Sequence, residues 1–126
     1  MIDVGTQPTG HRTLDIDGED YGYIVSHLNY GSGDYWNSRN WTLSLTDFQS
    51  TNVEINFEKF NVEEMRNGQC KDYLLIDSLY KFCEKPANPI TVNVNISTNQ
   101  ISFTFITNSV DNGGGFWLLY RGNFHA

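Results

Sequence analysis

Positive charge is scarce in this chain of 126 residues: Lys and Arg number 8 against 15 Asp and Glu, which gives a formal net charge of −7. A nucleic-acid binder and a protein held on an anionic membrane both need a basic face, so the charge balance argues against either partner. Long apolar runs are also missing, since the longest, Phe116 to Tyr120, falls far short of the roughly 20 residues of a membrane-spanning helix. With 39% hydrophobic and 18% charged residues, the chain still has the composition of one folded domain.

The signatures of common catalytic and phosphate sites are missing too. There is no Gly-x-Ser-x-Gly or His-Glu-x-x-His pattern, and no Lys follows the run Gly113–Gly115, as a phosphate loop requires. Asp34, Glu63 and Asp72 are the candidates for an acid pair of the glycosidase kind, but a domain of this size leaves little room for a deep cleft. We therefore expect a protein without enzymatic activity.

The acidic stretch from Asp15 to Asp20 lacks the pattern of an EF-hand calcium loop. Counted from Asp15, positions six and twelve of such a loop hold Asp20 and Ser26 instead of Gly and Glu. We interpret the stretch as a solvated acidic turn.

From residue 22 onward, apolar residues recur at every second position, which is the period of a β-strand with one face in a core. Turn sequences rich in Gly, Asn and Pro separate the runs, and no segment has the spacing of an amphipathic helix. The four residues Ser97–Gln100 predict a hairpin loop between two of the runs. We expect an antiparallel β-sandwich at 22–122, after a lead-in segment at 1–21 and before a tail at 123–126. The expected strands lie at 41–46, 53–58, 90–97, 101–105 and 116–120.

Two cysteines and two N-glycosylation triplets favour an extracellular protein. The triplets start at Asn40 (Asn-Trp-Thr) and Asn95 (Asn-Ile-Ser), and the cysteines are Cys70 and Cys83. Residues 1–5 have neither the basic nor the apolar region of a secretory leader. This leaves a cytosolic protein or a piece of a secreted one, and the triplets and the even number of cysteines favour the second.

The order of several short motifs resembles that of CUB domains, which are extracellular β-sandwich modules of the jelly-roll type. The motifs are Gly22-Tyr23-Ile24-Val25-Ser26, Trp41-Thr42-Leu43, Phe57-Glu58-Lys59-Phe60-Asn61-Val62-Glu63, Cys70-Lys71-Asp72-Tyr73, Phe82-Cys83 and Gly115-Phe116-Trp117-Leu118-Leu119-Tyr120. The chain departs from the family pattern in having one cysteine pair where many members have two, and in the spacing between Glu63 and Asp72.

The resemblance implies that Cys70 and Cys83 pair as a disulfide. A redox pair and a zinc site are the other interpretations of two cysteines, and they call for Cys-x-x-Cys spacing or for further Cys and His ligands, which are absent.

The resemblance also implies a calcium site of the type found in one CUB subgroup. Position by position, Glu63 and Asp72 are its acidic ligands, Asn108 stands at a second Asp position, Asp111 falls at the loop Asn position, and Tyr35 supports the others. Calcium takes six to eight oxygen ligands, and these residues supply carboxylate and amide oxygens. The alternative is that they are ordinary solvated loop residues.

By the same resemblance, we expect a secreted recognition module that binds another protein, with the calcium loops capturing a basic side chain of that partner. One alternative is calcium-independent carbohydrate binding, as in the spermadhesin members of the family. Another is a structural role within a larger extracellular protein. Tyr35, Trp36 and Trp117 are the candidates for stacking on a sugar or anchoring a partner, unless they only cover the ends of the sandwich, whereas Trp41 is expected in the core.

Overall fold

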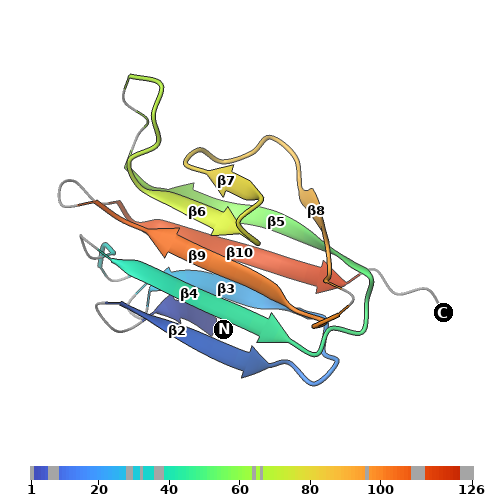
Figure 1. Cartoon of the computed structure of the whole chain (residues 1–126). Helices are drawn as coiled ribbons and strands as arrows, with labels where there is room; N and C mark the ends of the chain where they lie inside the picture. Colours follow the sequence, from blue (N-terminus) through green and yellow to red (C-terminus); the bar gives the residue numbers. More distant parts are fainter. Residues whose placement is uncertain are drawn as a thin grey trace.

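The part of the chain that the structure describes folds into ten strands arranged in two layers, and the structure is a computed structural model (Figure 1). It describes residues 2–5, 9–27, 30, 31, 33–35, 39–63, 65, 67–95, 97–108 and 113–122. No helix long and apolar enough to cross a membrane occurs among these residues. The strands are β1 (Ile2–Gly5), β2 (Thr9–Asp15), β3 (Tyr21–His27), β4 (Asn40–Thr46), β5 (Asn52–Asn61), β6 (Tyr73–Ile76), β7 (Tyr80–Phe82), β8 (Ile90–Asn93), β9 (Ile101–Ile106) and β10 (Gly115–Gly122).

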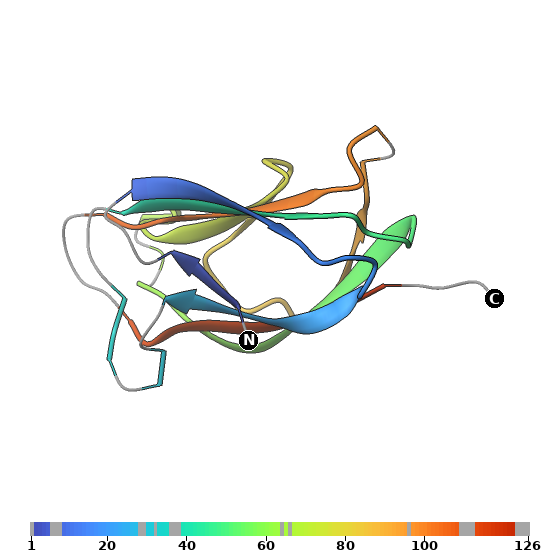
Figure 2. The same cartoon turned by 90° about the horizontal axis from the view of Figure 1, so that it is seen from below.

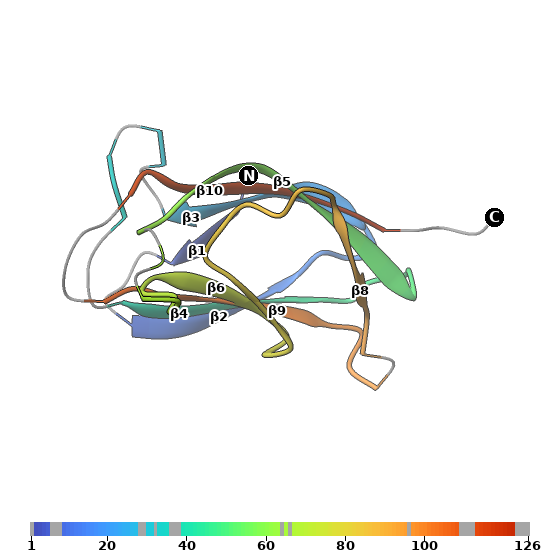
Figure 3. The same cartoon turned by 90° about the horizontal axis from the view of Figure 1, so that it is seen from above.

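The two layers are five-stranded sheets that face each other, as Figures 2 and 3 show edge-on. The first sheet has the strand order β1-β3-β10-β5-β8, and the second has the order β2-β4-β9-β6-β7. Strand pairs are antiparallel except at one edge of each sheet, where β1 runs parallel to β3 and β2 runs parallel to β4. The expected all-β sandwich is therefore confirmed.

The core lies between the sheets and follows the alternation of the sequence. In β9, Ile101, Phe103 and Phe105 are fully buried while the residues between them are half-buried, and β5 alternates in the same way. Trp41 is 1% exposed, which confirms its expected place in the core. The inward-facing aromatic rings meet edge to face, for example Phe105 and Phe116 with centroids 5.0 Å apart.

The expected hairpin at Ser97–Gln100 is wrong. β8 pairs with β5 in the first sheet, whereas β9 pairs with β4 and β6 in the second, so the segment between β8 and β9 connects the two layers. The expected strand at 90–97 also ends early, at Asn93. The side chain of Asn95 accepts a hydrogen bond from the backbone N–H of Ser97 at 2.8 Å, a local turn that replaces strand pairing.

Residues 1–21, expected as a lead-in segment, contribute the edge strands β1 and β2 to the two sheets. Val4 on β1 is 1% exposed, and Ile16 just after β2 is 9% exposed, so both belong to the core. The alternation of apolar and polar residues does not predict these strands, because their apolar residues are few and separated by Gly, Thr and Asp.

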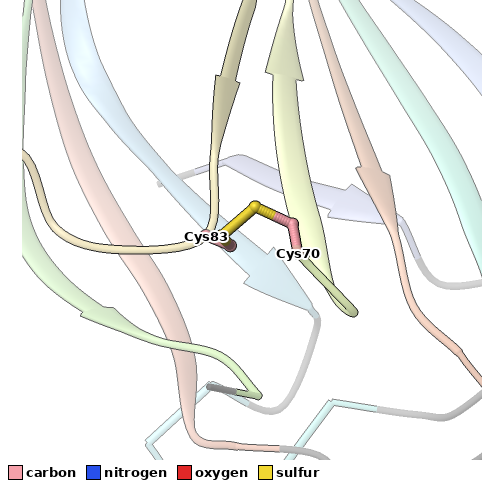
Figure 4. Close-up of a disulfide and its surroundings, with 2 residues drawn as sticks. All are labelled: Cys70 and Cys83. Carbon is pink, nitrogen blue, oxygen red and sulfur yellow. A yellow bond between two sulfur atoms is a disulfide. The ribbon is translucent and has the colours of Figure 1, made fainter. Parts of the chain in front are cut away.

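The disulfide between Cys70 and Cys83 is confirmed (Figure 4). Cys70 precedes β6 and Cys83 follows β7, so the bond closes the hairpin of these two strands at its open end. Phe82 beside it packs on Phe57 of the opposite sheet, with ring centroids 4.9 Å apart.

Candidate functional site

Three strand ends and one loop bring the predicted site residues to one end of the sandwich (Figure 1). Glu63 follows β5, Asp72 immediately precedes β6, and Asn108 follows β9. Because β6 and β9 are neighbours with Tyr73 opposite Ile106, Asp72 and Asn108 lie side by side. Tyr35 comes from the connection between β3 and β4. We call these four residues the loop site.

The hydroxyl of Tyr35 joins the two acidic residues of the loop site. It donates a hydrogen bond to Oδ2 of Asp72 and accepts one from the backbone N–H of Glu63 at 2.9 Å. Burial, together with the hydrogen bond to Asp72, raises the pKa of Tyr35, so the hydroxyl keeps the proton that it donates. Tyr35 is fully buried, which removes it from the candidates for stacking on a sugar.

Asn108 also contacts both acidic residues, in its case through their two carboxylates. Its backbone N–H donates to Oδ1 of Asp72 at 2.8 Å, and its side-chain Nδ2 donates to Oε1 of Glu63 at 2.6 Å. Both carboxylates are buried, since Asp72 has no exposed surface and Glu63 is 6% exposed. The sandwich therefore encloses two acidic side chains at one point and positions each of them by hydrogen bonds.

The donor set of the loop site fits a hard cation. Carboxylate and amide oxygens are the ligands that calcium prefers, and two carboxylates and one side-chain amide meet here. The present contact of Asn108 with Glu63 uses the nitrogen of the amide, and a half-turn of that amide would present its oxygen instead. Asp111, the third predicted carboxylate, lies outside the described residues.

A second set of hydrogen bonds, which the sequence did not indicate, holds the loop that carries Tyr35. Nε2 of His27 donates to the carbonyl of Gly33 at 2.7 Å, so Nδ1 accepts from the hydroxyl of Ser26 at 2.6 Å. The same hydroxyl accepts from the backbone N–H of Phe116 at 3.1 Å. No spacing in the sequence links positions 26, 33 and 116, because the contacts form only when β3 and β10 pair.

Two of the three consecutive glycines Gly113–Gly115, the last of which begins β10, take part in this network. Gly115 has φ +97°, and a Cβ there would collide with the hydroxyl of Ser26. Gly113 accepts a hydrogen bond from the backbone N–H of Tyr35 at 3.2 Å. These glycines let the chain pass close to the loop site and enter the last strand.

An open groove of about 730 Å³ lies next to the loop site. Asp34, the residue before Tyr35, and Asn61, two residues before Glu63, both line it. Its other lining residues include both signs of charge and two aromatic rings, namely Glu58, Lys59, Lys85, Tyr30 and Phe60.

Of the other two aromatic residues predicted to bind a sugar or a partner, the structure describes Trp117 and not Trp36. Trp117 lies on the outer face of the first sheet, half-buried, with its ring 5.5 Å from that of Tyr23. Tyr21 continues the row at 6.2 Å from Tyr23 and is 55% exposed.

Asp15, Asp17 and Asp47 form an acidic cluster near the ends of β2 and β4, at the opposite end of the sandwich from the loop site (Figure 1). Their carboxylates lie within 4.8 Å of one another, and Asp15 and Asp17 are exposed. Repulsion from Asp15, with a smaller contribution from Asp17, raises the pKa of Asp47.

Comparisons with known proteins agree with this architecture. The family model of the CUB domain matches residues 18–120. The CUB1-EGF-CUB2 domains of rat MASP-1 share 20% identity at a TM-score of 0.66, covering 93% of this chain and 44% of that one. The corresponding domains of human MASP-1/3 share 21% identity at a TM-score of 0.69, covering 88% and 41%.

The chain thus spans less than half the length of these two structures. A third, the MASP-1 CUB2 domain bound to Ca²⁺, shares 21% identity at a TM-score of 0.66 and covers 90% of this chain and 99% of that one. At identities this low, the structural similarity establishes a common fold and nothing finer. No curated protein matches the sequence.

Proposed function

The chain belongs to the CUB domain family, whose members are protein-interaction modules of extracellular proteins, and from this premise we propose that it binds a protein partner in a calcium-dependent way. The loop site holds the calcium, and the ordered loops around it capture a basic side chain of the partner. The domain itself acts by binding and catalyses no reaction.

The observation that carries the proposal is the convergence of two buried carboxylates. Glu63 and Asp72 come from positions separated along the chain, yet Tyr35 and Asn108 each contact both of them. Burying two like charges together costs free energy unless a cation or hydrogen bonds compensate. A solved CUB domain with bound Ca²⁺ supports the choice of cation.

When bound, calcium supplies two positive charges that neutralise the buried carboxylates and fix the loops that carry them. Glu63 and Asp72 would ligate it through carboxylate oxygens, and Asn108 through its amide oxygen. Tyr35 would hold Asp72 and the backbone of Glu63 in place from beneath, because its hydroxyl already binds both.

The charge of the molecule favours a basic partner. The chain has a net charge of −7, although within the groove beside the loop site Asp34 and Glu58 are balanced by Lys59 and Lys85. A Lys or Arg side chain of the partner would meet carboxylates at the rim of the site, and such complementarity speeds association and selects partners.

Thermal unfolding with calcium and then with a chelator tests the metal site. A ligand that binds only the folded state at 100 times its Kd adds about 2.7 kcal/mol, so calcium should raise Tm clearly. We expect Glu63→Gln and Asp72→Asn to lose the calcium-dependent rise. The matched control is the double variant D15N/D17N, which removes two carboxylates at the opposite end and should keep the rise. A rise that disappears in the control but not in E63Q would place the cation in the acidic cluster and contradict the proposal.

A library of peptides whose only charged side chain is one Lys or Arg tests the capture of a basic side chain. Binding of its members should require calcium and fail with the E63Q variant. Equal binding in the presence of a chelator would refute calcium-dependent capture of the partner. It would not bear on whether calcium binds, which the unfolding experiment tests separately.

Calcium-independent carbohydrate binding is the second candidate, and the row Tyr21–Tyr23–Trp117 on the outer face of the first sheet favours it. Aromatic rings of this kind stack on sugars. A glycan array should then show binding that survives a chelator and is lost in Trp117→Ala. Tyr80→Ala, which removes a partly exposed ring from the second sheet, is the control.

A further inference from the structure

Leu79 is the most exposed large hydrophobic side chain in the described part of the chain, at 79%. It follows the tight turn between β6 and β7, in which Asp77 and Ser78 both have positive φ, at 53° and 58°. Its backbone N–H donates to the carbonyl of Ile76 at 3.0 Å, and Asp77 is anchored to Ser102 by a side-chain hydrogen bond of 2.8 Å. The turn is therefore fixed, and it holds an apolar side chain out in solvent.

A hollow of about 390 Å³ separates this turn from the segment that follows β8. In Figure 3 the yellow turn and the orange segment both project beyond the second sheet. Leu79 and Val94 are the apolar residues of the lining, and Asn95, Thr98 and Gln100 provide polar groups. A volume at the lower end of small-ligand pockets has room for one sugar ring.

Asn95 stands at the rim of this hollow and is the first residue of an N-glycosylation triplet. Its Oδ1 accepts the hydrogen bond from Ser97, while its Nδ2 has no hydrogen-bond partner among the described residues. Its carbonyl accepts from Asn99 at 2.7 Å, so the backbone at this position is held. The nitrogen that an oligosaccharide would modify thus belongs to an exposed residue next to an apolar surface.

We propose that Asn95 carries an N-linked glycan whose first N-acetylglucosamine lies in the hollow and covers Leu79. Nδ2 attacks C1 of the first sugar of a lipid-pyrophosphate-linked oligosaccharide, the co-reactant of the step. The new N–C1 bond replaces the C1–O bond, the amide gives up one proton, and the lipid pyrophosphate leaves.

The chemistry of N-acetylglucosamine matches both sides of the hollow. Its ring face and acetyl methyl group are apolar and would contact Leu79 and Val94, while its hydroxyl and amide groups face Thr98 and Gln100. Covering an aliphatic side chain that is 79% exposed removes apolar surface from water, which stabilises the folded state. The hollow is lined by residues that follow β6 and precede β9, whereas the loop site precedes β6 and follows β9. These strand ends lie at opposite ends of the sandwich (Figure 1), so the inference is independent of calcium.

The test uses the whole chain secreted from animal cells with an added leader, in an N40Q background so that Asn95 is the one remaining triplet. Peptide mass mapping reports occupancy, and an endoglycosidase then trims the glycan to a single N-acetylglucosamine. We expect the trimmed protein to melt about 3 °C above the N40Q/N95Q protein, a shift that corresponds to a modest stabilisation in a domain of this size.

The L79S variant distinguishes the specific contact of the sugar with Leu79 from a general effect of glycosylation on stability. In the L79S background, the difference in Tm between the trimmed and the N95Q proteins should fall below 1 °C. Nuclear Overhauser contacts between the acetyl methyl and the Leu79 methyl groups give a second readout in the unmutated protein. An unmodified Asn95, or a sugar-dependent shift that is the same with and without L79S, would overturn the proposal.

Discussion

At the scale of single residues, Tyr35 is the point on which the loop site depends. Its hydroxyl donates a hydrogen bond to Asp72 and accepts one from the backbone N–H of Glu63. Its ring packs edge to face on that of Phe105, with the two centroids 5.0 Å apart. The sequence, through its family resemblance, could place Tyr35, Glu63, Asp72 and Asn108 in one site. It could not indicate that Asn108 bridges both carboxylates, because that contact depends on the register of β6 against β9.

The Tyr35→Phe variant keeps the ring and removes the hydroxyl. A buried oxygen of Asp72 then loses the hydrogen bond that this hydroxyl donates, so we expect the free energy of unfolding to fall by about 1–3 kcal/mol. Urea denaturation measures the loss. Tyr80→Phe, at a partly exposed position, should change it little. Equal effects of the two variants would mean that the Tyr35 hydroxyl is unimportant to the fold.

Asp47 gives a prediction for pH dependence. Its pKa is raised in the folded protein by repulsion from Asp15, so the charged form disfavours folding, and stability falls as the pH rises through the raised pKa. Replacing Asp47 with Asn, which tolerates the positive φ of 68° at this position, should therefore raise Tm at pH 7.

At pH 3, below the usual pKa of an Asp of about 3.9, the carboxyl is neutral in both states and the advantage of D47N should largely vanish. Melting curves at the two pH values measure this difference. Glu84→Gln, which removes an exposed acid outside the cluster, is the control. A gain in Tm for D47N that is the same at both pH values would have a cause other than charge.

At the scale of the elements, the alternation of apolar residues predicted five of the ten strands, β4, β5, β8, β9 and β10, and which face of each is buried. It did not predict partners, as the failed hairpin at Ser97–Gln100 shows, because alternation is a property of one strand and pairing is a property of two. β1, β2, β3, β6 and β7 are not among the strands that the alternation predicted. Three of them, β1, β2 and β7, lie at sheet edges, where fewer residues need to be apolar, whereas β3 and β6 lie inside the sheets.

The disulfide belongs to this scale because it closes the β6–β7 hairpin. Replacing Cys70 and Cys83 together with Ser should lower the free energy of unfolding by about 3 kcal/mol, the chain-entropy value for a loop of this length. Chemical denaturation of the double variant against the oxidised protein measures the loss. Unchanged stability would mean that the hairpin is held by its packing, including that of Phe82 on Phe57.

At the scale of the whole molecule, we expect the domain to need the chain before residue 18, where the family match begins. A fragment lacking residues 1–17 loses an edge strand from each sheet and the buried side chains of Val4 and Ile16. The burial of these two side chains alone accounts for about 3–6 kcal/mol. Thermal unfolding of residues 18–122 should show a sharply lower Tm, and a Tm equal to that of the whole chain would make the first strands dispensable.

The position of β10 in the first sheet has a consequence for the synthesis of the protein. The last strand of the domain to be synthesised is the middle strand of its sheet, with β3, made about ninety residues earlier, on one side and β5 on the other. Until β10 emerges from the ribosome, neither of these strands has this partner, so the first sheet cannot close before the whole domain has been made. A ribosome that stalls just before β10 would therefore expose two apolar strands without their shared partner, a substrate for chaperones and for quality control.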